Sequence, residues 1–272
     1  MRTLLALALL AAAAASPAAA QLTLRTKATT TQEMVVSANP LASAAGARVL
    51  RAGGNAIDAA IAIEAVLGLT EPQATGIGGG GFMVYYDAAT QKVTSFDARE
   101  AAPAVANGYY FYNTSGQALD FNTAVFSGRS VGVPGTVKLW DKVSRQYGSK
   151  PLAVALLPAI ELAIQGFAIS PRMAASIDSY KAVLAQDDNA RAYFLNPDGS
   201  GKPAGTVLRN PAYAQVLARV AFLGPQAFYG GPVARDIVAA VTSDARAGGA
   251  GSLTLADLDN YEVIERTPVC GP

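Results

Sequence analysis

The 272-residue sequence contains no histidine. The Ser-His-Asp and Cys-His arrangements, and zinc sites that use histidine, all need an imidazole, so this chain alone can build none of them. Any chemistry in which it takes part must use another base, or a group that lies outside the chain. A single cysteine, Cys270, also excludes an internal disulfide framework.

Charged residues are few and balanced, with 21 basic against 20 acidic side chains and no basic run. Nothing in this pattern favours nucleic acid or an anionic membrane as a partner. After the N-terminus the chain also lacks a long uncharged apolar segment; the best candidate, residues 152–163, is too short for a membrane span and contains Glu161. A hydrophobic content of 51% indicates a globular protein, and small-molecule chemistry is the favoured kind of function.

The first 20 residues, MRTLLALALLAAAAASPAAA, combine an early arginine, an apolar core and small residues at Ala18 and Ala20. This pattern is typical of a secretory signal peptide that is cleaved before Gln21. We therefore expect residues 1–20 to be removed and the protein, residues 21–272, to be periplasmic or secreted.

Hydrophobic periodicity and the positions of proline and glycine predict an uneven series of strands and helices. Asn55 is the expected N-cap of a helix that is apolar around nearly its whole circumference. No regular βαβ series is visible, so the predicted class is α+β. The expected strands are 34–37, 82–87, 92–97, 129–133 and 261–269, and the expected helices are 40–50, 55–69, 134–147, 151–165, 171–186, 211–223, 232–246 and 254–260.

A glycine-rich segment, residues 76–81 (GIGGGG), satisfies the dinucleotide pattern G-x-G-x-x-G, and Asp97 lies near the expected position of a ribose-binding acid. The order of elements argues against that interpretation. A dinucleotide loop leaves a strand and opens a helix, whose N-terminus holds the pyrophosphate. Here a helix precedes the glycines and a strand follows them. The alternative from the residues alone is that the glycines permit close backbone packing and turns through positive φ.

Other polar residues are weaker candidates for chemistry. Asp58 and Glu64 lie six residues apart on a buried helix, which favours hydrogen-bonded core acids over an acid/base pair. The aromatic run 109–112 is more typical of packing than of a ligand platform.

Four segments carry a resemblance to a known family: residues 39–58, 71–82 (EPQATGIGGGGF), 97–103 (DAREAAP) and 130–135. Together they resemble the large subunit of gamma-glutamyltranspeptidases, also called glutathione hydrolases, from about Val35 onward. The resemblance implies part of an N-terminal-nucleophile hydrolase with an αββα sandwich, incomplete without the small subunit. Such a proenzyme cuts itself in two, and residues 21–272 would be a large subunit interrupted before the autoprocessing site. Thr267 lacks the glycine-rich context of that site.

The resemblance also implies one substrate-binding residue. Arg99 matches the arginine that binds the alpha-carboxylate of the glutamyl group, and a guanidinium can grip a carboxylate through two hydrogen bonds where a lysine cannot. The alternative is a surface ion pair with Asp97 or Glu100. No catalytic residue, metal or cofactor is expected in this chain, because the nucleophilic threonine and its helpers belong to the small subunit.

The expected function of the completed protein is cleavage of the gamma-glutamyl bond of glutathione, with transfer of the glutamyl group to water or to an acceptor amino acid or peptide. The chain alone would be inactive. One alternative is a beta-lactam (cephalosporin or glutaryl) acylase of the same superfamily, although Arg99 favours a substrate with an alpha-carboxylate. Another alternative is a non-catalytic exported binding module.

Overall fold

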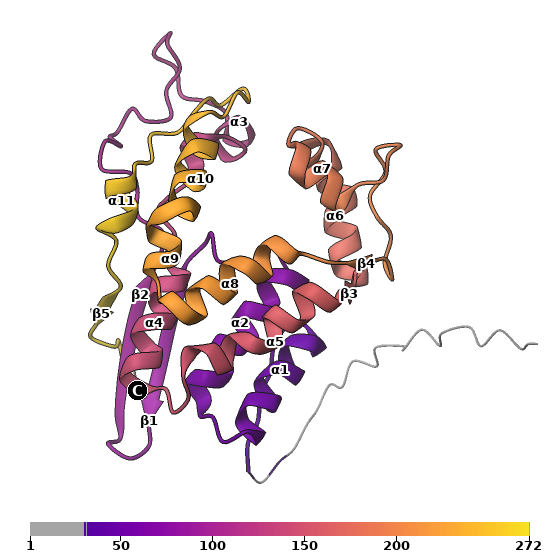
Figure 1. Cartoon of the computed structure of the whole chain (residues 1–272). Helices are drawn as coiled ribbons and strands as arrows, with labels where there is room; N and C mark the ends of the chain where they lie inside the picture. Colours follow the sequence, from indigo (N-terminus) through magenta and orange to yellow (C-terminus); the bar gives the residue numbers. More distant parts are fainter. Residues whose placement is uncertain (1–29, 31, 272) are drawn as a thin grey trace, which may run out of the picture. The chain divides into compact units, whose positions relative to one another are not determined.

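Helices and a small antiparallel sheet make up the described part of the chain, which is residues 30 and 32–271 of a computed structural model (Figure 1). The signal peptide expected over residues 1–20 lies outside these residues. The helices are α1 (Pro40–Arg51), α2 (Ala56–Thr70), α3 (Phe121–Val125), α4 (Thr136–Tyr147), α5 (Leu152–Gln165), α6 (Pro171–Leu184), α7 (Asp188–Phe194), α8 (Pro211–Leu223), α9 (Gln226–Tyr229), α10 (Gly231–Thr242) and α11 (Leu255–Asp259). The strands are β1 (Gly81–Asp87), β2 (Lys92–Ala98), β3 (Phe167–Ala168), β4 (Val207–Leu208) and β5 (Ile264–Arg266), and η1 (Gly128–Ser130) is a 3₁₀ turn. The predicted α+β class is confirmed.

Helix α2 is the central helix of the core. Asn55 caps it, because its side chain accepts hydrogen bonds from the amides of Ile57 and Asp58 while the Asp58 carboxylate accepts one from the Asn55 amide. The N-cap predicted from the sequence is thus confirmed. Helices α1, α4 and α5 pack against α2, and α8 packs against α5.

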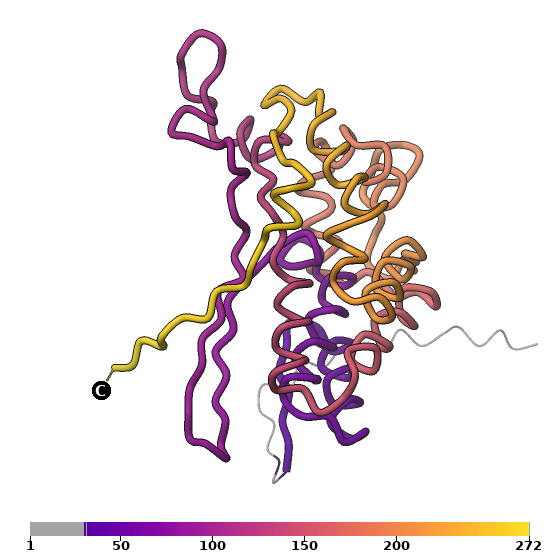
Figure 2. The backbone as a smooth tube through the Cα atoms, turned by 60° about the vertical axis from the view of Figure 1, so that its left-hand side comes forward, coloured from indigo at the N-terminus to yellow at the C-terminus, as the bar shows by residue number. Residues whose placement is uncertain are grey.

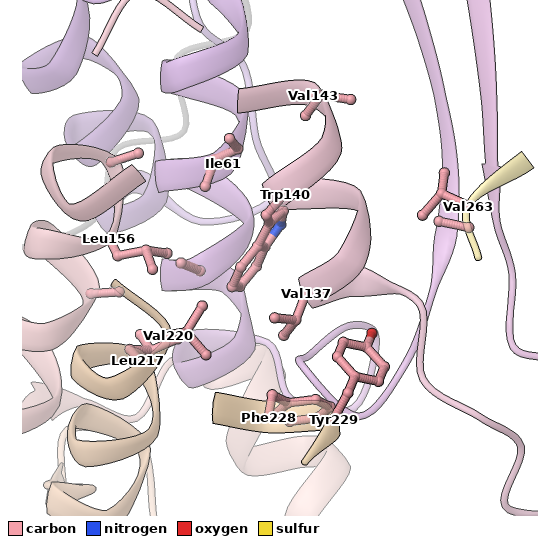
Figure 3. Close-up of a cluster of buried hydrophobic side chains, with 14 of the residues drawn as sticks. Ile61, Val137, Trp140, Val143, Leu156, Leu217, Val220, Phe228, Tyr229 and Val263 are labelled. Carbon is pink, nitrogen blue, oxygen red and sulfur yellow. The ribbon is translucent and has the colours of Figure 1, made fainter. Parts of the chain in front are cut away.

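The main hydrophobic core lies between these helices and the sheet. Trp140, the only tryptophan, is buried on α4 and is surrounded by side chains from α2, α5 and α8 (Figure 3). On the sheet side, the ring of Tyr147 packs 4.7 Å from that of Tyr85 and 6.1 Å from that of Phe96. These contacts attach one face of the sheet to α4.

The three-stranded sheet has the strand order β1-β2-β5, and both pairs are antiparallel. Figure 2 shows the long hairpin that contains β1 and β2 as two neighbouring segments. A separate two-stranded sheet pairs β3 with β4. In a strand successive side chains point to opposite faces, and Met83, Tyr85 and Phe96 point toward the helices. The opposite face is open, and it is apolar along β1, although Ser95, Asp97 and Arg266 of the neighbouring strands also lie on it. Its side chains Phe82, Val84 and Tyr86 are 66%, 71% and 57% exposed, and Ile264 of β5 is 50% exposed.

Some expected elements differ in the structure. Residues 34–37 form no strand, because they pair with no other strand among the residues that the structure describes. Their apolar side chains Met34 and Val36 are exposed. The strand expected over 129–133 is wrong as well. Its first residues form the turn η1, and of residues 129–133 only Val133 forms a bridge, to Ala101. Pro134, the next residue, has no amide to extend this bridge into a ladder.

The expected C-terminal strand, 261–269, shortens to β5, and the short helices α3, α7 and α9 were not anticipated. The N-cap of helix α7 is Asp187, and no proline marks its start. The prolines that indicated where the neighbouring helices begin therefore gave no indication of α7. Within the described residues, no helix has both the length and the apolar character that a membrane crossing requires.

Candidate functional site

The end of β2 carries Arg99 and Glu100, and hydrogen bonds fix its backbone on both sides. The amide of Arg99 donates to Asp97 Oδ1 (3.0 Å), and its carbonyl accepts from the hydroxyl of Tyr261 (2.8 Å). Two residues later, Ala101 and Val133 exchange backbone hydrogen bonds of 3.3 and 2.8 Å. The position of Arg99 is therefore set by segments that are far apart in the sequence.

The side chain of Arg99 is 63% exposed and makes one ion pair, from Nε to Glu100 Oε2 at 3.2 Å. Within residues 32–271, no acceptor is bound to its two terminal nitrogens. Of the two ion pairs considered from the sequence, the one with Glu100 forms and the one with Asp97 does not. The guanidinium thus keeps the pair of donors that a carboxylate needs.

Asp97 pairs instead with Arg266 of β5, whose Nη2 and Nε lie 2.6 and 2.7 Å from Asp97 Oδ2. The amide of Arg99 and then the Arg266 guanidinium lower the pKa of the Asp97 carboxyl. Asp97 is therefore ionised at neutral pH, and it ties β5 to the turn that carries Arg99.

Glycines allow the backbone to approach the end of β2 closely. A Cβ atom at Gly80 would lie 2.1 Å from the carbonyl oxygen of Ala98, and one at Gly135 would lie 2.0 Å from the same oxygen. The carbonyl of Gly79 accepts hydrogen bonds from the amides of Gly135 (2.8 Å) and Thr136 (3.1 Å) at the start of α4. Of the glycines in residues 76–81, Gly80 confirms the close-packing interpretation, whereas a Cβ at Gly76, Gly78 or Gly81 would meet no atom within 4 Å. None of these glycines has a positive φ, so the expected use of that conformation is wrong. The order helix, glycines, strand is confirmed.

Tyr261 was not identified from the sequence, yet it joins two parts of the site. Its hydroxyl binds the Arg99 carbonyl, and its ring stacks on that of Tyr229 at 6.3 Å. Burial, with smaller contributions from the charges of Asp97 and Glu100, raises the pKa of Tyr261 to about 12. The hydroxyl therefore remains a donor at physiological pH. An aromatic residue just before a strand gives no signal for such a contact across the fold.

Two cavities share Arg99, Glu100 and the two alanines that follow them. The first, of about 520 Å³, we call the acidic hollow, because Asp97, Asp257 and Glu262 also line it. The second, of about 720 Å³, we call the basic hollow, because Arg129 lines it and Glu100 is its single acid among the described residues. Arg99 thus stands between two environments of opposite charge.

The other candidates from the sequence lie elsewhere. Asp58 is buried and accepts hydrogen bonds from the amides of Asn55 (2.9 Å) and Ser149 (3.1 Å) and from the Ser149 hydroxyl (2.7 Å). Glu64 accepts a hydrogen bond from the Thr75 hydroxyl. The two acids share no partner, in agreement with structural roles. In the described part of the chain, no group of three or more acids or cysteines could hold a metal ion.

Solved structures with this fold define the class. The chain is similar to the gamma-glutamyltranspeptidase of Helicobacter pylori, with a TM-score of 0.84 and 33% identity over 90% of this chain and 68% of that chain. It is also similar to a cephalosporin acylase from Bacillus halodurans, with a TM-score of 0.69 and 30% identity over 85% of this chain and 42% of that chain. The fold is that of the N-terminal-nucleophile hydrolases, of which the described residues form one part.

The sequence comparisons narrow this class to a family. The family model described as Gamma-glutamyltranspeptidase matches residues 42–272. A glutathione hydrolase proenzyme from Bacillus subtilis (strain 168) is 40% identical over 238 residues, which is 88% of this chain and 39% of that protein. Acylase ACY 1 proenzyme of Pseudomonas sp. (strain V22) is 37% identical over 90% of this chain and 43% of that protein. The chain belongs to the gamma-glutamyltranspeptidase family and spans about two fifths of the length of these relatives.

Proposed function

We propose that this chain is the large-subunit part of a gamma-glutamyltransferase, which cleaves the gamma-glutamyl bond of glutathione and passes the glutamyl group to water or to an amino acid or peptide. The observation that carries the proposal is Arg99, whose backbone is fixed while its two terminal nitrogens are unoccupied among the described residues. Family membership and the relatives named glutathione hydrolase support it.

Arg99 binds the alpha-carboxylate of the glutamyl group and so positions the gamma-carbonyl for attack. The acidic hollow beside Arg99 favours the positive charge of the alpha-amine. Bond cleavage depends on the N-terminal threonine of a small subunit, whose hydroxyl passes its proton to the threonine's own alpha-amine and attacks the gamma-carbonyl. The gamma-glutamyl amide bond breaks, the amine of cysteinylglycine takes up the proton and leaves, and an acyl-enzyme remains. Water or an amine then takes the acyl group. The residues described in this chain contribute binding and orientation.

The open face of the sheet supports the presence of that second subunit. Phe82, Val84 and Tyr86 alternate along β1 on this face, and all three are more than half exposed. A contiguous apolar surface of this kind marks an interface. In an αββα sandwich the sheet of the small subunit covers it. We further propose, from the signal-peptide pattern at residues 1–20, that the assembled protein is periplasmic or secreted.

The decisive experiment uses the protein completed with the C-terminal part that its relatives possess, and measures release of p-nitroaniline from gamma-glutamyl-p-nitroanilide. Arg99→Ala removes a bidentate charge-assisted contact and is expected to lower kcat/KM by about 100-fold, mostly through KM. Arg99→Lys keeps the positive charge but lacks the planar pair of N–H donors of a guanidinium. It is therefore expected to recover only part of the lost kcat/KM.

Arg235→Ala is the matched control, because Arg235 is exposed on α10 and lines neither hollow. Gel analysis of the two subunits must show that each variant is processed normally. An unchanged KM in a processed Arg99→Ala protein contradicts the assigned role of Arg99. A completed protein without activity on any gamma-glutamyl donor contradicts the proposed function and favours a binding module.

The acylase relatives make a second activity worth measuring. A glutaryl group keeps the carboxylate that Arg99 would bind but lacks the alpha-amine. Asp257 and Glu262 add negative charge to the acidic hollow, whereas Asp97 is paired with Arg266. We therefore expect the protein to prefer glutamyl over glutaryl donors, because only the glutamyl group carries a positive alpha-amine. Faster hydrolysis of a glutaryl cephalosporin than of the anilide supports the acylase function instead.

A further inference from the structure

The basic hollow contains a second arginine for which the proposed reaction has no use. Arg129 lies in η1, which follows the loop that contains Tyr110, and it lines the same cavity as Arg99. The volume of about 720 Å³ lies within the range of small-molecule sites. The cavity is large enough for more of a substrate than its glutamyl group.

The guanidinium of Arg129 is held in place by only one of its nitrogens. Nη1 donates to the carbonyls of Tyr110 (3.1 Å) and Tyr112 (2.9 Å), which attaches the side chain to the loop. Within residues 32–271, Nε and Nη2 have no hydrogen-bond acceptor and no acid pairs with Arg129. The arginine is thus oriented before any ligand arrives, and three of its N–H donors are still available.

This edge of the guanidinium faces Gly249, which has no side chain to cover it, and no acid among the described residues compensates its charge. A Cβ atom at Gly249 would lie 3.7 Å from Nε and 3.8 Å from Nη2, so a side chain at this position would lie beside the available donors. Gly249 has a φ of +82°, a conformation that side chains other than glycine's rarely adopt. The nearby acid Asp244 is already bound by the Gly128 amide and by Arg246.

We propose that Arg129 forms a second anion subsite, which binds the C-terminal carboxylate of a gamma-glutamyl peptide while Arg99 binds its alpha-carboxylate. This inference rests on the proposed function. It assigns the substrate class as gamma-glutamyl peptides with a free C-terminus, of which glutathione is one. A carboxylate suits the subsite, because a planar pair of oxygens can accept from Nε and Nη2 together. Donors without that carboxylate bind through Arg99 alone.

The test compares three donors in the completed protein: glutathione, glutathione with its C-terminal carboxyl converted to an amide, and gamma-glutamyl-p-nitroanilide. The wild type is expected to show a kcat/KM about 10- to 100-fold higher for glutathione than for the amide. Arg129→Gln is expected to remove that preference, while kcat/KM for the amide and the anilide changes less than about twofold. Arg129→Lys is expected to restore part of the preference, because it keeps the charge.

Arg235→Gln is the control for loss of a surface charge. If Arg129 only anchors the loop at Tyr110, its replacement lowers kcat/KM for all three donors alike, and the subsite is wrong. Equal use of glutathione and its amide by the wild type also overturns the subsite, and this measurement needs no variant to fold. Failure of the proposed function looks different, because the wild type then cleaves none of the three donors.

Discussion

Replacing Gly80 with alanine tests whether close backbone packing builds the site. The new Cβ would lie 2.1 Å from the Ala98 carbonyl oxygen, whereas an ordinary contact begins at 3.4 Å. The conflict involves two backbones, and no flexible side chain can relieve it. Overpacking costs about 1–3 kcal/mol in general, and we expect about 3 kcal/mol here because the backbone must move. For a unit of this size the thermal midpoint should fall by about 6–12 °C.

Gly76→Ala is the matched control, since it makes the same substitution in the same glycine-rich segment. A Cβ at Gly76 meets no atom within 4 Å, and Gly76 does not have a positive φ. The thermal midpoint of the Gly76→Ala variant should stay constant or rise slightly, because alanine lowers the conformational entropy of the unfolded chain. Scanning fluorimetry of the two variants beside the wild type checks both expectations. Equal stability of the Gly80 and Gly76 variants would refute the packing argument.

Two further predictions concern the surroundings of Arg99. Tyr261→Phe removes the donor to the Arg99 carbonyl, so the free energy of unfolding should fall by about 1 kcal/mol in denaturant titration. The same variant should raise KM for the anilide more than it lowers kcat, and an unchanged KM would show that this hydrogen bond does not position Arg99. Asp97 has a lowered pKa in the folded state, so its contribution is complete above about pH 4 and is lost as pH falls further. The wild type should therefore lose more thermal stability on acidification than Asp97→Asn, and parallel losses would contradict a role for the pair with Arg266.

The sequence predicted those parts of the fold and the site that are determined by residues close together in the chain. The Asn55 cap, the long helices that begin near prolines and the order of helix, glycines and strand all depend on neighbouring residues, and the structure confirms them. Arg99 emerged as a candidate through the family resemblance, and its role in binding substrate stays a prediction.

The rest of the site depends on contacts between distant segments. Tyr261 lies 162 residues from Arg99, and no periodicity connects the two. The role of Arg129 depends on where its guanidinium lies relative to the loop at Tyr110 and to Gly249. The strand expected over 129–133 was wrong for a related reason. Its residues form the turn η1 and a single bridge from Val133 to Ala101, and the local apolar pattern does not reveal that distant partner.

The dependence of Arg99 on Tyr261 also has a consequence for the timing of synthesis. Ribosomes add about 5–20 residues per second, so the 162 residues between these two partners take about 8–32 s to appear. During that interval β2 can pair with β1, but the backbone groups on its other edge have no partner strand until β5 has been synthesised. An open strand edge can pair with other chains. The nascent protein therefore passes through a period in which the hydrogen bond that fixes Arg99 is unformed and the edge of β2 is open to other chains.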